Sequence, residues 1–189
     1  MIEKTAFNKI ETERLILKPH EITFEYATAL YNLIVENKDH LSKFMPLLNK
    51  VSSPEDEFNY SLSCEKKWKE MTGAEYGIWT KEGELIGTCC FVDIDYDRHS
   101  GEIGYWLDKK QTGKGYMTEA VQALEKEFFD RGFNRITIMM DTENTPSQNV
   151  AIRRNFTKEG LLRHFHFNPY FDSFRNFYIY SKLKSERER

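Results

Sequence analysis

The chain has 189 residues, 40% of them hydrophobic, which is enough for one globular domain with a full core. Its formal net charge is −3 and its pI is about 6.0, so it lacks the overall basic charge typical of nucleic-acid-binding proteins, and we expect no direct nucleic-acid partner. Residues 1–18 contain no apolar run typical of a signal peptide, and no stretch has the length of a membrane span. We therefore expect a cytoplasmic protein without membrane contact.

The N-terminal part of the chain predicts one strand and two helices. A short strand is expected at residues 14–17, and apolar residues at helical spacing follow over residues 22–37. Residues 44–48 form an apolar loop. A second helix is expected to begin within residues 52–56, with one of the two serines there as its N-cap, and to continue to Gly73.

The remainder of the chain predicts three strands, followed by alternating helices and strands. Short polar turns separate the three strands, which should therefore pair antiparallel. A helix and a further strand come next, and this order favours a crossover that makes two strands parallel. The expected elements are strands at 76–80, 85–95 and from 102, a helix from 116 to 131, a strand at 134–140, a helix at 148–155, and strands at 161–167 and 175–183.

The glycine turn before the central helix predicts a phosphate site. Gly113 and Gly115 permit backbone conformations that a Cβ would resist, and the helix start after them offers unpaired N–H groups. Gly115 follows Lys114, so the turn lacks the Gly-Lys-Ser/Thr ending of a P-loop, and Thr118 stands in place of the third glycine of the dinucleotide fingerprint. Nucleoside triphosphates and dinucleotides are therefore disfavoured. The three cysteines (Cys64, Cys89, Cys90) lack the spacing of metal ligands, and we expect reduced packing residues and no metal.

Residues 111–116 resemble the pyrophosphate loop of the GNAT superfamily of N-acetyltransferases, whose cofactor is acetyl-coenzyme A (acetyl-CoA), and the predicted order of elements matches that fold. The resemblance implies an α+β fold with a mixed, mostly antiparallel sheet of about seven strands, one splayed parallel pair and about four flanking helices. It implies a single acetyltransferase domain over residues 1–189, with a core at about 11–183 and a charged tail at 184–189.

Four sequence words narrow the resemblance to the RimJ/RimL-type branch. They are EIGYW at 102–106, GKGYMTEA at 113–120, NTPS at 144–147 and RRNF at 153–156. That branch is named for acetylating the N-terminal amine of ribosomal proteins. The resemblance therefore implies direct transfer of acetyl from acetyl-CoA to a primary amine, and a homodimer.

The resemblance also assigns the residues that bind the cofactor. The end of the central strand should diverge from the next parallel strand, and the pantetheine arm should insert into the gap. The assigned residues are Trp106 and Leu107 for the pantetheine arm, Gln111, Thr112, Gly113, Lys114, Gly115, Tyr116 and Met117 for the pyrophosphate, and Asn144 and Ser147 on the facing segment.

Four residues are expected to act in catalysis. The backbone N–H of Trp106 would polarise the thioester carbonyl. Glu102 lies where histone-modifying members keep a glutamate base, and is otherwise a solvated strand residue. His166 replaces a glutamate of the branch and is the second candidate base, or else a structural histidine. Ser147 would assist the departing thiolate or cap its helix, because Ala151 occupies the position of the tyrosine acid of other members.

Other functions stay open from the sequence. The acceptor is alternatively a small amine such as a polyamine, an amino sugar or an antibiotic. A non-catalytic acetyl-CoA sensor would explain the absent tyrosine and the replaced glutamate. Ribosome or RNA binding through Arg153, Arg154 and Arg163 is disfavoured by the net charge.

Overall fold

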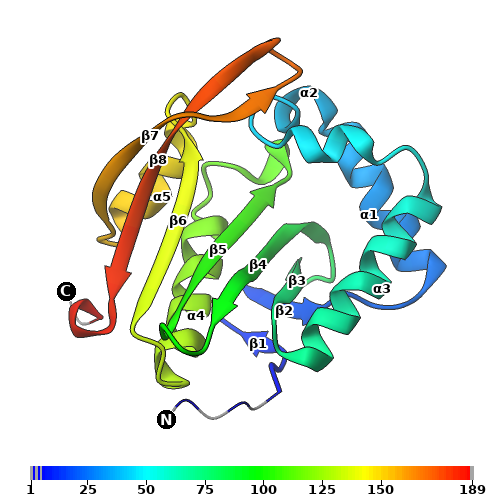
Figure 1. Cartoon of the computed structure of the whole chain (residues 1–189). Coiled ribbons are helices and arrows are strands. Elements are labelled where there is room, and N and C mark those ends of the chain that lie inside the picture. The colour runs from blue at the N-terminus through cyan, green and yellow to red at the C-terminus, as the bar shows by residue number, and fades with distance from the viewer. Residues whose placement is uncertain (1, 3, 5, 188–189) are drawn as a thin grey trace.

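The computed structural model of the chain describes residues 2, 4 and 6–187, without the side chains of residues 47 and 49. This described part folds around one mixed sheet in the strand order β1-β2-β3-β4-β5-β6-β8-β7 (Figure 1). Neighbouring strands pair antiparallel, except that β5 and β6 are parallel. The strands are β1 (Ile10–Glu11), β2 (Leu15–Pro19), β3 (Ala74–Thr80), β4 (Leu85–Asp95), β5 (Ser100–Leu107), β6 (Arg135–Asp141), β7 (Thr157–Asn168) and β8 (Ser173–Leu183).

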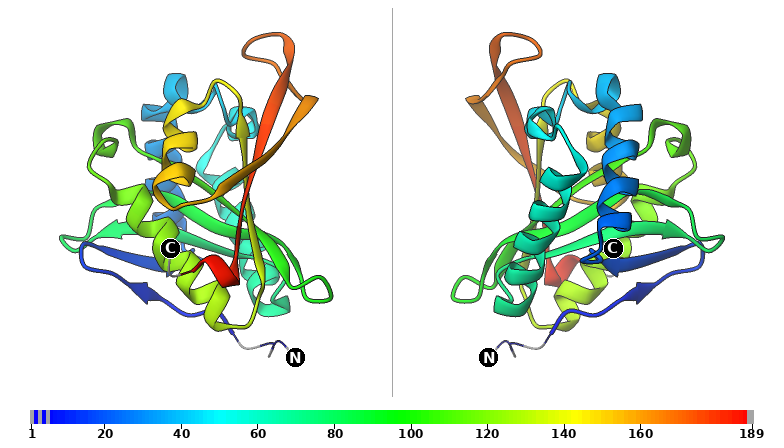
Figure 2. Two further views of the ribbon diagram at one scale, coloured as in Figure 1. Left: turned by 90° about the vertical axis from the view of Figure 1, so that its left-hand side faces the viewer. Right: turned by 90° about the vertical axis from the view of Figure 1, so that its right-hand side faces the viewer.

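Helices cover both faces of the sheet (Figures 1 and 2). We call the face that carries α1 and α3 the front, and the face that carries α4 and α5 the back. The helices are α1 (Phe24–Glu36), α2 (Lys38–Leu41), α3 (Pro54–Glu70), α4 (Tyr116–Asp130) and α5 (Thr145–Arg153), with short 3-10 helices at Pro46–Lys50, Lys109–Gln111 and Lys184–Glu186.

Alternation along the strands divides the core between the two faces. Ile136 and Ile138 of β6 are buried in the back core beside α4, whereas Thr137 between them is half-buried. The back core is the larger and contains Leu124 and Phe128 of α4. The front core joins α1 and α2 to β5 through Tyr26, Leu30, Ile34, Leu41 and Trp106.

The parallel pair opens toward the C-terminal ends of its strands. Hydrogen-bonded pairing between β5 and β6 ends at Glu102 and Thr137, yet β5 continues to Leu107 and β6 to Asp141. Beyond this point the two strands diverge (Figure 1). Strand segments without a ladder partner leave backbone N–H and C=O groups that need other partners. The gap is therefore a place where a ligand could complete the sheet.

This architecture confirms the predicted mixed, mostly antiparallel sheet with a splayed parallel pair, and the expected serine cap of α3 is Ser53. The sequence pattern missed β1 and α2, because two and four residues are too short to show a period. Part of the expected loop at 44–48 forms a 3-10 helix that begins at Pro46. Across the described residues, we find no helix that combines the length and the hydropathy needed to cross a membrane.

Candidate active site

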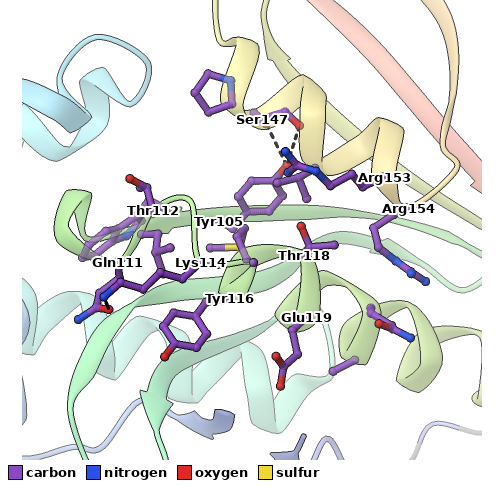
Figure 3. A pocket seen from close by; sticks show the side chains of 18 of the residues that line it. Tyr105, Gln111, Thr112, Lys114, Tyr116, Thr118, Glu119, Ser147, Arg153 and Arg154 are labelled. Atoms are coloured by element: carbon purple, nitrogen blue, oxygen red, sulfur yellow. Dashed lines mark hydrogen bonds between the residues drawn. The ribbon is translucent and has the colours of Figure 1, made fainter. Parts of the chain in front are cut away.

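A cleft of about 1460 Å³ lies at the divergence of β5 and β6, beside the N-terminus of α4 and along α5 (Figure 3). All of the predicted cofactor-binding residues line it. They are Trp106, Leu107, Gln111, Thr112, Gly113, Lys114, Gly115, Tyr116, Met117, Asn144 and Ser147. The fold thus brings together residues from the central strand, the glycine turn and α5.

The glycine turn leads directly into α4. Gly113 and Gly115 have φ values of 78° and 83°, in the left-handed region that favours glycine. Gly115 is the N-cap of α4 and has no side chain to satisfy the first N–H groups of the helix. These groups and the helix dipole make this end of the cleft suited to an anion.

Gln111 organises the turn through its side chain. It is 8% exposed, and its Nε2 donates to both carboxylate oxygens of Glu84 at 3.1 Å. Its Oε1 accepts a hydrogen bond from Lys114 Nζ at 2.7 Å. The Gln111 side chain therefore ties the turn to the β3–β4 hairpin, a role for Glu84 that no local sequence pattern could indicate.

The pairing of β4 with β5 decides which backbone groups face the gap. The N–H of Asp108 donates to the carbonyl of Ile86 on β4 at 2.8 Å. Trp106 lies two residues before Asp108 and is paired with Thr88 of β4. Because backbone groups alternate between the two sides of a strand, the N–H and C=O of Trp106 face β4. Those of Tyr105 and Leu107 face the gap toward β6. We therefore assign the expected hydrogen bond to the thioester carbonyl to the N–H of Leu107 instead of that of Trp106.

A side-chain contact inside the cleft joins Tyr105 of β5 to Ser147 of α5. Their hydroxyl oxygens are 2.9 Å apart, and Figure 3 shows both side chains in the cleft. Burial raises the pKa of Tyr105 to about 12, against a smaller lowering by Ser147. The capping role considered for Ser147 belongs to Asn144, whose Oδ1 accepts the Ser147 N–H at 3.2 Å. The Ser147 hydroxyl is therefore not the helix cap, and its hydrogen-bond partner is Tyr105.

Tyr105 was not among the residues that the sequence indicated. The sequence places this residue within the strand predicted from 102, and the family position of a tyrosine acid falls on the helix at Ala151. The structure places a tyrosine hydroxyl in the cleft from β5 instead. Only the spatial neighbourhood of Ser147 reveals this, because 42 positions separate the two residues.

Glu102 and His166 do not line the described cleft. Glu102 is on β5 three residues before Tyr105, and alternation directs its side chain to the front face. Burial and then the charge of Asp93 raise the pKa of Glu102 to about 7. His166 is half-buried on β7 opposite Arg175, with its ring 6.4 Å from that of Phe177.

Two basic residues of α5 and its C-cap border the other end of the cleft. Arg153 is exposed, whereas Arg154 is bound to Glu125 of α4 through two hydrogen bonds of 3.0 Å. Among the described residues, no three His, Cys, Asp or Glu side chains converge as a metal site would require.

Splayed parallel strands beside a glycine turn, with a helix start that lacks a side-chain cap, resemble the cofactor site of the acetyltransferase class. The sequence matches the family described as "Acetyltransferase (GNAT) domain" over residues 14–157. The chain therefore belongs to the GNAT acetyltransferase family.

Its relatives include enzymes that modify ribosomal proteins. The ribosomal-protein-serine acetyltransferase of Escherichia coli (strain K12) is 30% identical over 168 residues, which is 88% of this chain and 92% of that protein. The structure of RimL, the ribosomal L7/L12 alpha-N-protein acetyltransferase, in complex with coenzyme A has a TM-score of 0.86 at 25% identity and covers 93% of this chain and 97% of the other. The crystal structure of the microcin C7 self-immunity acetyltransferase MccE in complex with acetyl-CoA and AMP has a TM-score of 0.84 at 28% identity, with 91% and 93% covered.

Proposed function

We propose that this protein transfers the acetyl group of acetyl-CoA to the N-terminal amine of a ribosomal protein. The observation that carries the proposal is the similarity to the Escherichia coli ribosomal-protein-serine acetyltransferase, which extends over nearly all of both chains. The likeness to RimL in complex with coenzyme A supports the same substrate and the same cofactor.

The residues of the cleft fit acetyl-CoA. The uncapped N-terminus of α4 and the turn at Gly113 and Gly115 suit a pyrophosphate. The backbone groups of Tyr105 and Leu107 that face the gap suit the amide groups of a pantetheine arm. Asn144 uses its Oδ1 as the helix cap, so its Nδ2 remains to donate to the same arm.

The proposed reaction uses groups on both faces of β5. Acetyl-CoA supplies an acetyl group activated as a thioester. The acceptor nitrogen bonds to the acetyl carbon as the carbon–sulfur bond breaks, and Glu102 accepts the proton that the amine loses. The Leu107 N–H stabilises the developing oxyanion. Ser147, held by Tyr105, donates a hydrogen bond to the departing sulfur, which then takes up a proton from solvent.

The pKa of Glu102 suits an N-terminal amine. A base with a pKa of about 7 can deprotonate an α-amine, whose pKa is about 8, at little cost. A lysine or polyamine ammonium, with a pKa of about 10, would be a poorer match for the same base. His166 is the alternative base in our proposal.

A small-molecule amine is the second candidate acceptor. The similarity to the microcin C7 self-immunity acetyltransferase over nearly the full length of both chains favours it.

We also propose a cytoplasmic homodimer, as the family resemblance implies. In support, Phe165, Phe167 and Phe174 of the β7–β8 hairpin are 49%, 45% and 58% exposed, and a second copy could cover them. Sedimentation of wild type and of Phe165→Ser/Phe174→Ser should show a dimer and a monomer, respectively.

Free-thiol release tests the function. The purified protein is mixed with acetyl-CoA and with ribosomal-protein N-terminal peptides, polyamines, amino sugars or aminoglycosides. Release with a peptide is the expected result. Thiol release with small amines alone would show that the acceptor is a small amine and not a ribosomal protein. Binding of acetyl-CoA without thiol release in any mixture would indicate a sensor.

A further inference from the structure

The β1–β2 turn, residues 12–14, is hydrogen-bonded to the first turn of α4. The Arg14 Nε donates to Glu119 Oε2 at 2.7 Å, and the Arg14 backbone N–H donates to Glu119 Oε1 at 2.8 Å. The Thr12 hydroxyl donates to the same Oε1 at 2.6 Å. Both oxygens of one helix carboxylate therefore accept hydrogen bonds from a segment more than a hundred positions earlier in the chain.

Arg14 also contacts the glycine turn itself. Its Nη1 donates to the carbonyl of Lys114 at 2.9 Å, between the two glycines. Its guanidinium lies 4.8 Å from the centre of the Tyr116 ring, a cation–π contact. A Cβ placed on Gly115 would lie 3.4 Å from Arg14 Nη2. One guanidinium thus spans the turn from Lys114 to Glu119.

The Gln111 side chain holds Lys114 of the turn through its Nζ, and Arg14 holds the same residue through its backbone carbonyl. Two glycines with positive φ give a backbone that can adopt many conformations when free. A Cβ placed on Gly113 would meet no atom within 4 Å, so the turn faces open space in that direction. Burial opposes ionisation of Glu119, but the hydrogen bonds from Thr12 and Arg14 outweigh it and lower its pKa. The carboxylate is therefore ionised, and the ion pair with Arg14 is intact, at neutral pH.

We propose that Arg14 is a positioning residue for the cofactor pyrophosphate, acting through the glycine turn. With Glu119 it fixes the turn in the conformation that offers its N–H groups to phosphate before the cofactor binds. Donors that are already ordered cost no conformational entropy on binding, so the contribution should appear in cofactor affinity. This inference rests on the pyrophosphate site of the proposed function.

The test compares acetyl-CoA with S-acetyl-pantetheine, a thioester that lacks the pyrophosphate and the nucleotide. Dissociation constants are measured by calorimetry for acetyl-CoA and by NMR titration for S-acetyl-pantetheine. The variants are Arg14→Met, Glu119→Gln and the double variant. The matched control is Arg98→Met, which removes an exposed guanidinium paired with Asp95 outside the cleft. Arg14 is 44% exposed in its side chain, so its variant should fold, and thermal unfolding checks this.

Each single variant should weaken acetyl-CoA binding by about tenfold, and the double variant should be no weaker, because the two residues act as one unit. Binding of S-acetyl-pantetheine and kcat at saturating acetyl-CoA should stay at wild-type values, as should every property of the control. Equal acetyl-CoA affinity in wild type and Arg14→Met would overturn the inference. Equal losses for both thioesters would also overturn it, because they indicate a general disturbance of the cleft.

Two further outcomes are distinct. A loss in Arg14→Met that Glu119→Gln does not reproduce would mean that Arg14 contacts phosphate directly, and would overturn the positioning role. Wild-type protein that fails to bind acetyl-CoA would remove the proposed function itself, and with it the reason for the turn to be positioned.

Discussion

The hydroxyl oxygens of Tyr105 and Ser147 lie 2.9 Å apart, one carried by β5 and the other by α5. Burial raises the pKa of Tyr105 to about 12, so the phenol keeps its proton at neutral pH. The pair holds two hydroxyl protons, and the contact between them uses one. When the Tyr105 phenol is the donor, to the Ser147 hydroxyl at 2.9 Å and to the Ser147 carbonyl at 3.4 Å, the Ser147 proton remains to be donated into the cleft.

We expect Tyr105→Phe to lower kcat by about tenfold or more, because the leaving sulfur loses the group that orients its hydrogen-bond donor. The KM for acetyl-CoA should change little. Tyr96→Phe is the matched control, since its hydroxyl donates to the Met71 carbonyl outside the cleft. A wild-type kcat in Tyr105→Phe would show that the thiolate leaves without this pair.

The raised pKa of Glu102 predicts a pH dependence. A general base works only when deprotonated, so kcat/KM should rise with pH through a step with a midpoint at about 7, below the step that the acceptor amine adds near its own pKa of about 8. Glu102→Gln should abolish the lower step and lower kcat/KM by about a hundredfold at pH 8. The measurement is the pH profile of acetyl transfer to one N-terminal peptide.

Two variants separate Glu102 from other titrating groups. Asp93→Asn removes a charge that raises the pKa of Glu102, so the midpoint should move to lower pH. The titration of the acceptor amine cannot respond to that substitution. His166→Gln should leave the pH profile unchanged. If the lower step in kcat/KM disappeared in that variant, the base would be His166.

Local patterns predicted the parts of the site that are continuous in sequence, and missed the contacts between distant segments. The turn at Gly113 and Gly115 was predictable because glycine and helical periodicity are local signals. The contacts of Tyr105 with Ser147 and of Arg14 with Glu119 join residues that are distant in sequence, so only the folded structure reveals them. The backbone direction of Trp106 depends on the register with β4, and a shift of one residue would reverse it.

The glycine turn predicts a charge-specific effect on cofactor binding. Gly113→Glu should abolish acetyl-CoA binding, because it adds a negative charge where we place the pyrophosphate. Gly113→Ala is the control, because both variants strain the positive φ equally and a Cβ meets no atom within 4 Å. Calorimetry should show a far larger loss for Gly113→Glu than for Gly113→Ala. Similar affinities would place the pyrophosphate elsewhere.

A buried ion cluster fixes α5, and with it Ser147, to the back of the sheet. Lys182 of β8 is 1% exposed and donates to Glu125 Oε2 at 3.0 Å and to the Arg154 carbonyl at 2.8 Å. Glu125 also binds the Arg154 guanidinium. Glu125→Gln would leave the buried ammonium without its counter-charge, and should lower the free energy of unfolding by about 3 kcal/mol.

Removing both buried charges separates the cost of an unpaired ion from the value of the pair. Glu125→Gln/Lys182→Met should be less destabilised than the sum of its single variants, because no fully buried charge then lacks a partner, and the Arg154 side chain is 21% exposed to solvent. Urea unfolding at pH 7 measures all three. Lys126→Gln is the control, since its exposed pair with Asp130 should contribute less than about 0.5 kcal/mol. Strict additivity would mean that Glu125 and Lys182 are not coupled and that the cluster does not hold α5 in place.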